Sequence, residues 1–545
     1  MIEFEHKLPS LTLGEKTIGT YNNYELGFPS VMTTDGCELG LFLYALRNNI
    51  YRGRRLIFID GENLTCCHNW IRDHVHTVKA ARHWEYDIRT FLDFIIKNQR
   101  EDGQFFELIK QYDDYHWKMV NPDCYKLYEE DNLTLVRLEL EADVEYLVVE
   151  GAKYYYRQSG DREWLCKTLP SLEKAIEYMT SDDKRFDKAL GLVKRPFTVD
   201  TWDFAYYGEN VERTKFDRRI SPDTPMSVMH GDNSGVYSAM ITLSYFNKIL
   251  GNEEKSLYWQ RKAEQLRDNM IKHLWGGKFF VHQLHLNHKG ADDLEWQRLS
   301  LSNAYDINRG VTTLEQSRAI IEEYISRQDR EGIFAEWFSI DPPYKSFGSH
   351  KPGEYVNGAI SPFTAGELAK AALCSGYEEY GYGIIKRFME LVRRDGDVYF
   401  LYCPDSKPQP HGGPSSWGAA AFISAVDEGL AGVVDEGVRY SEIAFSPRFA
   451  VTEYKELRYI TGYEKSSTRV EVRYVINDTG MRYDLISPAS LVRCHVLLPK
   501  GKAPSALTAN GESKAFREVK VADSLYLDFT VGLRDEKKLS IEILF

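Results

Sequence analysis

Residues 162–182 read REWLCKTLPSLEKAIEYMTSD, and apolar residues lie three, four and seven positions after Leu172. This spacing follows the 3.6-residue period of an α-helix and puts these side chains on one face. A helix with one apolar face needs a partner surface. The short link Gly160-Asp161 joins it to another helical stretch, at residues 138–160, so we predict that the two helices form a hairpin.

The same period recurs along most of the chain. It predicts twelve helices in six hairpins, at residues 37–51, 71–84, 86–99, 138–160, 162–182, 229–251, 253–276, 300–310, 313–328, 362–376, 377–396 and 414–430. Long connections mostly alternate with short ones and cover residues 100–137, 183–228, 277–299, 329–361 and 397–413. They should therefore gather at one end of the helical body. Because loops longer than about a dozen residues are usually functional, we expect a cleft at that end.

After Val433 the pattern changes to the alternation of apolar and polar residues that is typical of β-strands, as in RVEVRY at residues 469–474. We therefore expect three parts, namely an N-terminal extension (1–36), an (α/α)6 barrel that forms the catalytic domain (37–433) and a C-terminal β-sandwich (434–545). The predicted fold class is mainly α, a six-hairpin (α/α)6 toroid followed by a β-sandwich.

The composition restricts the class of partner. A formal charge of −13 and an isoelectric point near 5.7 disfavour nucleic acid, because phosphate backbones bind dense lysine and arginine surfaces. Aromatic residues make up 13% of the chain, and their rings either fill a large core or line a carbohydrate cleft. The start, MIEFE, lacks the layout of a signal peptide, and no apolar run approaches the roughly 20 residues that span a bilayer. We expect a cytoplasmic protein with a carbohydrate ligand and no membrane segment; the oligomeric state is not indicated.

Residues 69–73 read NWIRD and open a predicted helix after a loop. Trp70 offers a ring face, and Arg72 and Asp73 offer the donors and acceptors that bind neighbouring sugar hydroxyls. A local ion pair, with Asp73 favoured by the helix dipole, would explain the same residues. The stretch therefore predicts either a sugar contact or an ion pair at a helix start.

Residues 199–204 read VDTWDF and lie in a long connection. Asp203 directly follows Trp202, and partial burial beside an aromatic ring raises the pKa of a carboxyl group. A raised pKa is what a general acid needs to protonate a glycosidic oxygen near neutral pH. We predict Asp203 as the catalytic acid, with Asp200 and Trp202 as substrate contacts.

The order of these motifs resembles that of the six-hairpin glycosidases of the glucoamylase, trehalase and glucosidase type, over residues 37–433. The resemblance matches Trp70, Arg72 and Asp73 to a Trp-x-Arg-Asp element that begins the second barrel helix and binds the terminal sugar. It therefore implies a sugar-binding function for this part of the chain.

The resemblance also matches Asp203 to the general acid between the fifth and sixth helices. Asp217 is a rival acid, because Asp-Arg-Arg occurs in barrel invertases of this superfamily. SWGAAAF at residues 416–422 is similar to the last barrel helix of the group, and Trp417 within it is a further candidate for contact with sugar.

The general base does not stand where the resemblance implies. These hydrolases usually carry it in a Glu-x-Tyr element between the eleventh and twelfth helices, where this chain has Leu401. The long connection before the tenth helix offers Glu336 and Glu354, with Trp337 as an aromatic contact, and Asp405 is a third option. Glu354 is slightly favoured. An inverting mechanism needs the acid and the base roughly 6.5–9.5 Å apart, with a water between them.

Two other interpretations remain open. An inverting phosphorylase needs only an acid, and HGGPSS at residues 411–416 offers His411, backbone N–H groups and hydroxyls to phosphate, although it also fits a turn with a serine helix cap. The other open interpretation is a catalytically inactive barrel that binds carbohydrate. No metal or cofactor is expected, since His74 and His76 would point about 200° apart on a helix. The leading prediction is an inverting glycoside hydrolase for a small oligosaccharide or glycoside.

Overall fold

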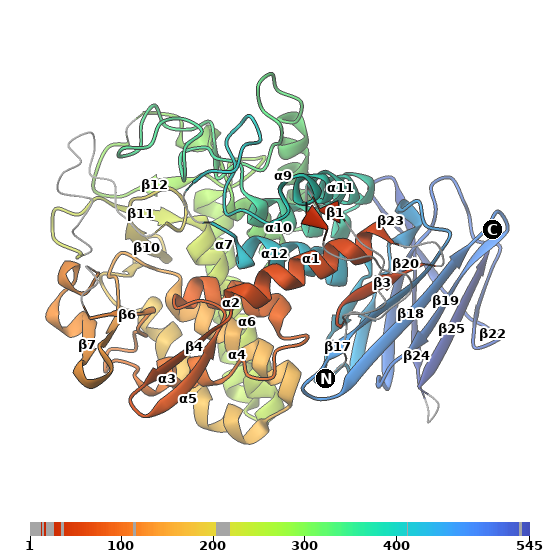
Figure 1. Ribbon diagram of the computed structural model, residues 1–545, viewed down its shortest axis with the longest axis horizontal. Coiled ribbons are helices and arrows are strands. Elements are labelled where there is room, and N and C mark those ends of the chain that lie inside the picture. The colour runs from red at the N-terminus through yellow and green to blue at the C-terminus, as the bar shows by residue number, and fades with distance from the viewer. Residues whose placement is uncertain are drawn as a thin grey trace.

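The structure is a computed structural model that describes residues 12–13, 16–17, 27–33, 37–112, 116–202, 219–290, 292–410, 413–533 and 537–545. Each of the twelve predicted helices is present in it (Figure 1). They are α1 (Glu38–Gly53), α2 (Ile71–Ala81), α3 (Thr90–Lys97), α4 (Val144–Ser159), α5 (Arg162–Met179), α6 (His230–Leu250), α7 (Glu253–Leu274), α8 (Ser302–Asn308), α9 (Leu314–Ser326), α10 (Pro362–Cys374), α11 (Glu378–Asp395) and α12 (Ser416–Ser424).

Local groups set the helix ends. α4 ends at Gly160, whose φ of 67° suits a residue without a Cβ atom, and the Asp161 carboxylate then accepts the Trp164 N–H at 2.9 Å to begin α5. α4 begins later than residue 138, its predicted start. The chain is still extended up to Val136, which pairs with Leu108, and the Leu138 N–H then donates to the Glu107 carboxylate at 3.1 Å.

The even-numbered helices pack against one another in a closed cycle, α2 on α4, then α6, α8, α10, α12 and α2 again. Odd-numbered helices cover them, as α7 covers α6. α7 buries one stripe that includes Trp259, Ala263 and Met270, whereas α10 is buried along nearly its whole length. α10 and α12 approach closely at Gly366, where an added Cβ would lie 2.6 Å from the Cβ of Ala421. Small residues thus let the inner helices meet.

The C-terminal strands form two sheets that face each other, on the right of Figure 1. Phe445 of one sheet meets Tyr483 of the other edge-on, with ring centroids 5.7 Å apart. One sheet has the order β15 (Val433–Asp435), β16 (Glu442–Phe445), β20 (Leu491–Leu497), β24 (Ser524–Gly532), β23 (Arg517–Val521). The other has the order β22 (Glu512–Ser513), β21 (Ala506–Ala509), β25 (Lys538–Leu544), β19 (Gly480–Ile486), β18 (Thr468–Ile476), β17 (Glu456–Tyr463), β3 (Ser30–Met32).

The strand β17 ties three parts of the chain together. It pairs antiparallel with β3, Tyr459 opposite Val31, so a segment that we predicted within the N-terminal extension adds a strand to the C-terminal sheet. The Tyr459 hydroxyl donates to Asp427, just after α12, and the Gly462 carbonyl lies 2.9 Å from Nδ1 of His83, just after α2. These contacts attach the sheet to the helical body.

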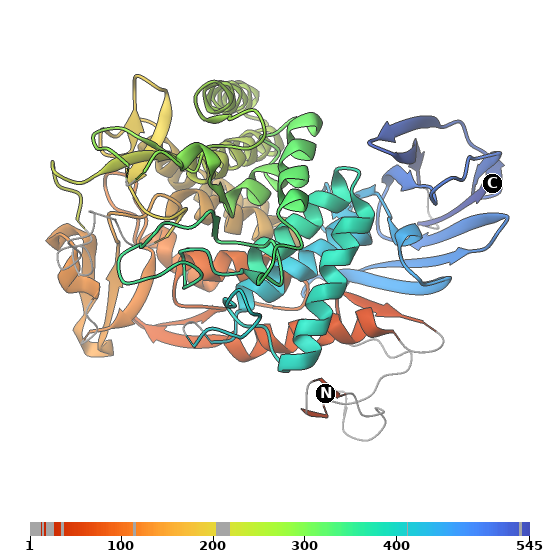
Figure 2. The same cartoon turned by 90° about the horizontal axis from the view of Figure 1, so that it is seen from above.

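Short strands occupy much of the long connections. They are β4 (Arg55–Ile59), β5 (Glu62–Cys66), β6 (Leu108–Gln111), β7 (Tyr125–Tyr128), β8 (Leu133–Val136), β9 (Phe186–Asp187), β10 (Leu192–Pro196), β11 (Met226–Met229), β12 (Gln283–His285), β13 (Leu299–Ser300) and β14 (Ile340–Asp341). β1 (Thr12–Leu13) and β2 (Lys16–Thr17) form a separate pair. Figures 1 and 2 show β6, β7 and β10 to β12 at the end of the helical body away from the two large sheets. Among the described residues, no helix is both long and apolar enough to cross a membrane.

Candidate active site

A cleft of about 160 Å³ brings together several of the predicted site residues. Residues from the start of α2, from the segment after β10 and from three later parts of the chain line it. The described lining residues are His68, Trp70, Arg72, Asp73, Thr201, Trp202, Tyr355, Phe400 and Trp417. Five of these nine are predicted sugar contacts, so separate motifs of the sequence meet at one place.

The start of α2 is pinned to a neighbouring segment. The Ile71 N–H donates to the Glu107 carbonyl at 2.7 Å, and the Ile109 N–H donates to the Asn69 carbonyl at 3.0 Å. α2 begins directly afterwards, which places Asp73 in its first turn, 3.9 Å from Nδ1 of His68. The backbone thus holds Trp70, Arg72 and Asp73 at the cleft.

Arg72 is oriented by two buried carboxylates that the sequence analysis did not single out. Its guanidinium donates to Asp143 through Nε and Nη2 and to Glu141 through Nη2. Burial would raise the pKa of Asp143, but Arg72 outweighs it and holds the pKa below the usual value. The ion pair at this helix start is therefore made with Glu141 and Asp143 rather than with Asp73.

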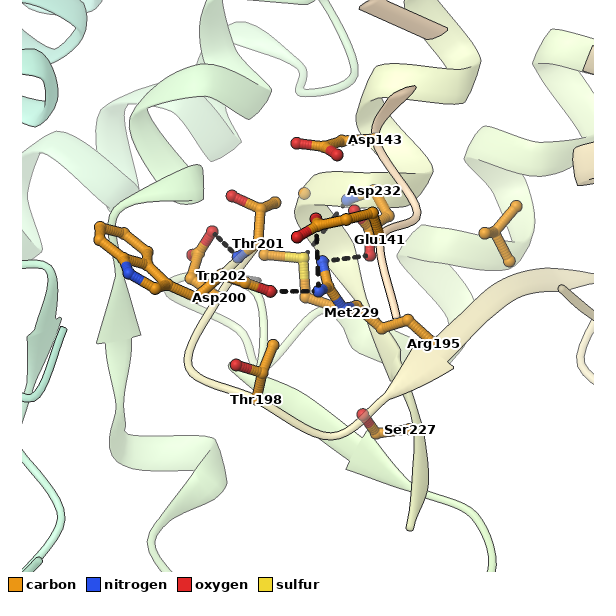
Figure 3. Close-up of polar contacts among 12 residues, drawn as sticks. Glu141, Asp143, Arg195, Thr198, Asp200, Thr201, Trp202, Ser227, Met229 and Asp232 are labelled. Atoms are coloured by element: carbon orange, nitrogen blue, oxygen red, sulfur yellow. Dashed lines mark hydrogen bonds and ion pairs between the residues drawn. The ribbon is translucent and has the colours of Figure 1, made fainter. Parts of the chain in front are cut away.

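A second arginine, Arg195 of the strand β10, is fully buried near the start of α6 (Figure 3). Nη2 of Arg195 donates to the Trp202 carbonyl, and its Nη1 lies 3.6 Å from the Asp232 carboxylate. Burial raises the pKa of Asp232 to about 6, although Arg195 opposes it. Asp232 is therefore a buried carboxyl group that titrates near neutral pH, which is a property of general acids.

Asp200 anchors the segment that leads to Trp202. Its carboxylate accepts the Ser302 hydroxyl at 2.6 Å and the Ser302 N–H, the first of α8, at 3.1 Å, while its own N–H donates to His282 at 2.9 Å. The backbone of Asp200 has a φ of 48°. Residues other than glycine keep this left-handed conformation where surrounding contacts enforce it. Asp200 is fully buried and is not among the described lining residues, so it positions Trp202.

The aromatic walls are fixed by ring contacts. Trp202 meets Tyr355 edge-on at 5.5 Å, and Tyr355 has a φ of 45°. Trp417 stacks with His76 at 4.3 Å and donates its indole N–H to the Tyr305 hydroxyl at 2.8 Å. Burial keeps the pKa of His76 well below its usual value, so this ring is neutral.

The predicted bases do not line the described cleft. Glu336 is buried against α11, where it accepts from Arg387 at 2.6 Å, and Arg387 also lies over the ring of Trp337. Glu354 is exposed and accepts the Lys351 N–H at 2.9 Å, although Tyr355 beside it lines the cleft.

The remaining candidate positions do not supply a carboxylate to the described cleft either. Leu401 is buried in an apolar cluster that includes Trp202. Asp405 pairs with Lys407 at 2.5 Å in an exposed turn. Three further residues that the sequence predicted for the site, Asp203, Asp217 and His411, lie outside the described residues.

Similarity to known structures is confined to the fold. The α-L-rhamnosidase from Dictyoglumus thermophilum aligns with a TM-score of 0.58 and 14% identity, covering 97% of this chain and 51% of that chain. The GH78 family rhamnosidase of Bacillus sp. GL1 has a TM-score of 0.58 and 12% identity, and the alignment covers 88% of this chain and 44% of that chain. The Streptomyces avermitilis α-L-rhamnosidase complexed with L-rhamnose has a TM-score of 0.52 and 13% identity, and the alignment covers 96% of this chain and 43% of that chain. This chain thus spans about half the length of these proteins or less. No protein-family model and no curated protein matches the sequence.

Proposed function

The chain has the fold of the six-hairpin (α/α)6-barrel glycosidases, and from this fold and its cleft we propose that the protein is a glycoside hydrolase with an (α/α)6 toroid as its catalytic body. The cleft carries the proposal. Its described lining combines Trp70, Arg72 and Asp73 with Trp202 and Trp417 from far along the chain. Aromatic walls with a few charged groups suit a neutral ligand that is rich in hydroxyl groups.

The size of the cleft supports a small substrate. The described lining encloses about 160 Å³, well below the roughly 300–1,000 Å³ of a pocket for a drug-sized ligand. This volume favours the terminal sugar of a small glycoside or oligosaccharide. Since three of the similar structures are rhamnosidases, aryl α-L-rhamnosides are the first substrates to test, followed by other aryl glycosides.

The proposed mechanism is inverting. Asp203, which follows Trp202 in the chain, protonates the glycosidic oxygen as the bond from this oxygen to C1 breaks. A water attacks C1 from the opposite face and gives its proton to a carboxylate base. Glu354 is the proposed base, supported by the position of its neighbour Tyr355 in the cleft wall. The contacts of Arg195 and Asp200 support the acid, because they hold the segment that leads to it.

Asp203→Asn tests the acid. General acids contribute about 10²–10⁴-fold to catalysis, so kcat on a p-nitrophenyl glycoside should fall by that factor. A 2,4-dinitrophenyl glycoside needs less protonation, so the same variant should recover much of its rate there. Asp183→Asn, in an exposed turn after α5, serves as the matched control. A loss of less than about tenfold in Asp203→Asn would reject the assignment.

Asp232 is the competing acid, and its variant separates the two. If Asp232→Asn shows the leaving-group dependence described above and Asp203→Asn does not, the proton comes from Asp232. If Asp203→Asn alone shows it, the assignment to Asp203 stands.

A phosphorylase is the second candidate function, and the burial of Leu401 in an apolar cluster favours it. An enzyme that uses phosphate as its nucleophile does not need a carboxylate base at that position. Turnover in phosphate-free buffer, measured as reducing sugar released, separates the two functions. Release that requires phosphate and yields a sugar 1-phosphate would replace the hydrolase proposal.

A further inference from the structure

A second cavity, of about 280 Å³, lies inside the helical body. Residues of α2, α4, α6, α8 and α10 and of the turn after α12 line it. The described lining carries six cationic side chains against three carboxylates, namely Lys79, Arg82, Lys153, Arg157, Arg309 and Lys370 against Glu150, Glu367 and Glu428. Such an excess of positive charge is unusual within a protein interior, because buried charges normally occur in pairs.

The three carboxylates are already bound. Glu367 pairs with Lys79, and Glu428 pairs with both Arg82 and Lys370. The third carboxylate, Glu150, accepts the hydroxyl of Tyr154. Two carboxylates thus pair with three of the cationic groups, and Glu150 is the lining carboxylate that acts on Lys153 and Arg309 from a distance.

Lys153, Arg157 and Arg309 make no ion pair with a carboxylate in the part of the chain that the structure describes. Arg309 instead donates to the Gly231 carbonyl at 2.8 Å and lies over aromatic rings. Arg157 acts on Asp435 behind the cavity wall, where it opposes the rise that burial causes in the pKa of that carboxyl. The positive charge within the cavity remains in excess.

Two of these three cations repel each other. Lys153 and Arg157 are four residues apart on α4, so they project from one face of the helix, here into the cavity. Burial and the nearby Arg157 together lower the pKa of Lys153 to about 8, although Glu150 and Glu428 oppose this change. An anion between the two would relieve this repulsion.

We infer that this cavity is a binding site for a small oxyanion of the phosphate or sulfate type, held by Lys153, Arg157 and Arg309. Guanidinium groups match the oxygens of such anions with two parallel hydrogen bonds, and an ammonium group adds a point charge. At about 30 Å³ per water, the volume equals roughly nine waters, which leaves room for a tetrahedral oxyanion and its remaining hydration.

The site is distinct from the sugar cleft. His76 and Tyr305 line the cavity, Trp417 lines the cleft, and Trp417 contacts both of these residues. These three side chains form the wall between the two spaces. The anion is therefore inferred as an internal ligand of the helical body and not as the nucleophile of a phosphorylase.

Isothermal titration of the full chain, exchanged into anion-free buffer, tests the inference with sodium phosphate and sodium sulfate as the probes. About one equivalent should bind per chain. Lys153→Met should weaken the binding by about tenfold or more, as expected for the loss of one charged hydrogen-bond donor. Glu150→Gln removes a negative charge from the lining and should tighten it by roughly threefold or more.

Lys167→Met is the matched control, because Lys167 lies exposed on the outer face of α5. It should bind like the wild type. If Lys153→Met does not fold, Lys153→Arg should retain binding while Glu150→Gln tightens it. Absence of binding by either probe at 50 mM, or an affinity that Lys153→Met and Glu150→Gln leave unchanged, would overturn the inference. Binding is measured without turnover, so the result does not depend on the proposed glycosidase activity.

Discussion

Replacement of Arg72 by methionine removes a cation from between two buried carboxylates. The guanidinium contacts Asp143 through two nitrogens and Glu141 through one, and both acids are almost fully buried. Loss of one partner from a buried ion pair costs about 3–5 kcal/mol. Glu141 keeps Arg195 at 4.0 Å, so we expect a loss near the lower limit, about 3 kcal/mol at pH 7.

This cost should depend on pH with a definite sign. Arg72 holds the pKa of Asp143 below its usual value against the effect of burial. A carboxyl with a lowered pKa contributes stability that is present above its unfolded pKa and is lost as the pH falls through its folded pKa. Without Arg72, only the weaker charges of Arg195 and Arg137 oppose burial, so the pKa of Asp143 is higher in the variant and the variant takes up a proton earlier as the pH falls. The difference in stability between wild type and variant should shrink from pH 7 towards pH 4.

Urea unfolding at pH 7 and pH 4.5, followed by tryptophan fluorescence, measures this difference. Arg89→Met is the matched control, since Arg89 pairs with Asp93 at 2.6 Å and with Asp161 at 3.5 Å, and all three side chains are at least 32% exposed. Each such surface pair is worth only about 0.3–0.5 kcal/mol, so the control should cost about 1 kcal/mol at most. The explanation is refuted if Arg72→Met costs no more than Arg89→Met at pH 7, or if its cost grows as the pH falls.

Two further variants test the groups around Trp202. The pKa of Asp232 rises from an unfolded value near 4 to about 6, so this carboxyl removes about 3 kcal/mol of stability as the pH rises through that window. Asp232→Asn should abolish this loss of stability, measured as the difference between the unfolding free energies from urea unfolding at pH 4 and pH 7. The same difference in the variant and the wild type would contradict the raised pKa of Asp232. Asp200→Asn should weaken the cap on α8 by about 1 kcal/mol and lower kcat more than it changes KM, because Trp202 loses its anchor. Wild-type kcat in that variant would count against the positioning role.

The helices could be predicted because their signal is local. α7 repeats an apolar residue every three or four positions, and that period is readable wherever the helix packs. The turn at Gly160 is equally local, because its positive φ concerns one residue. The sequence also predicted that the start of α2 and the segment before Asp203 belong to one site.

The partners of these residues could not be predicted, because they are distant in the chain. Asp143 lies 71 residues from Arg72, and no period links them, although LELEAD at residues 138–143 places three acids just before a helix. Glu336 has the sequence context of a loop carboxylate, yet Arg387 of α11, 51 residues later, binds it. Only the packing of helices against connections brings such groups together.

The stereochemistry of the first product tests the central proposal most directly. Proton NMR in phosphate-free buffer, recorded during the first minutes of hydrolysis of an aryl glycoside, shows which anomer is released before mutarotation. We predict the anomer opposite to that of the substrate, and its loss in Asp203→Asn. Release of the retained anomer would contradict the inverting mechanism, and no release from any aryl glycoside tested would contradict the proposed hydrolase function itself.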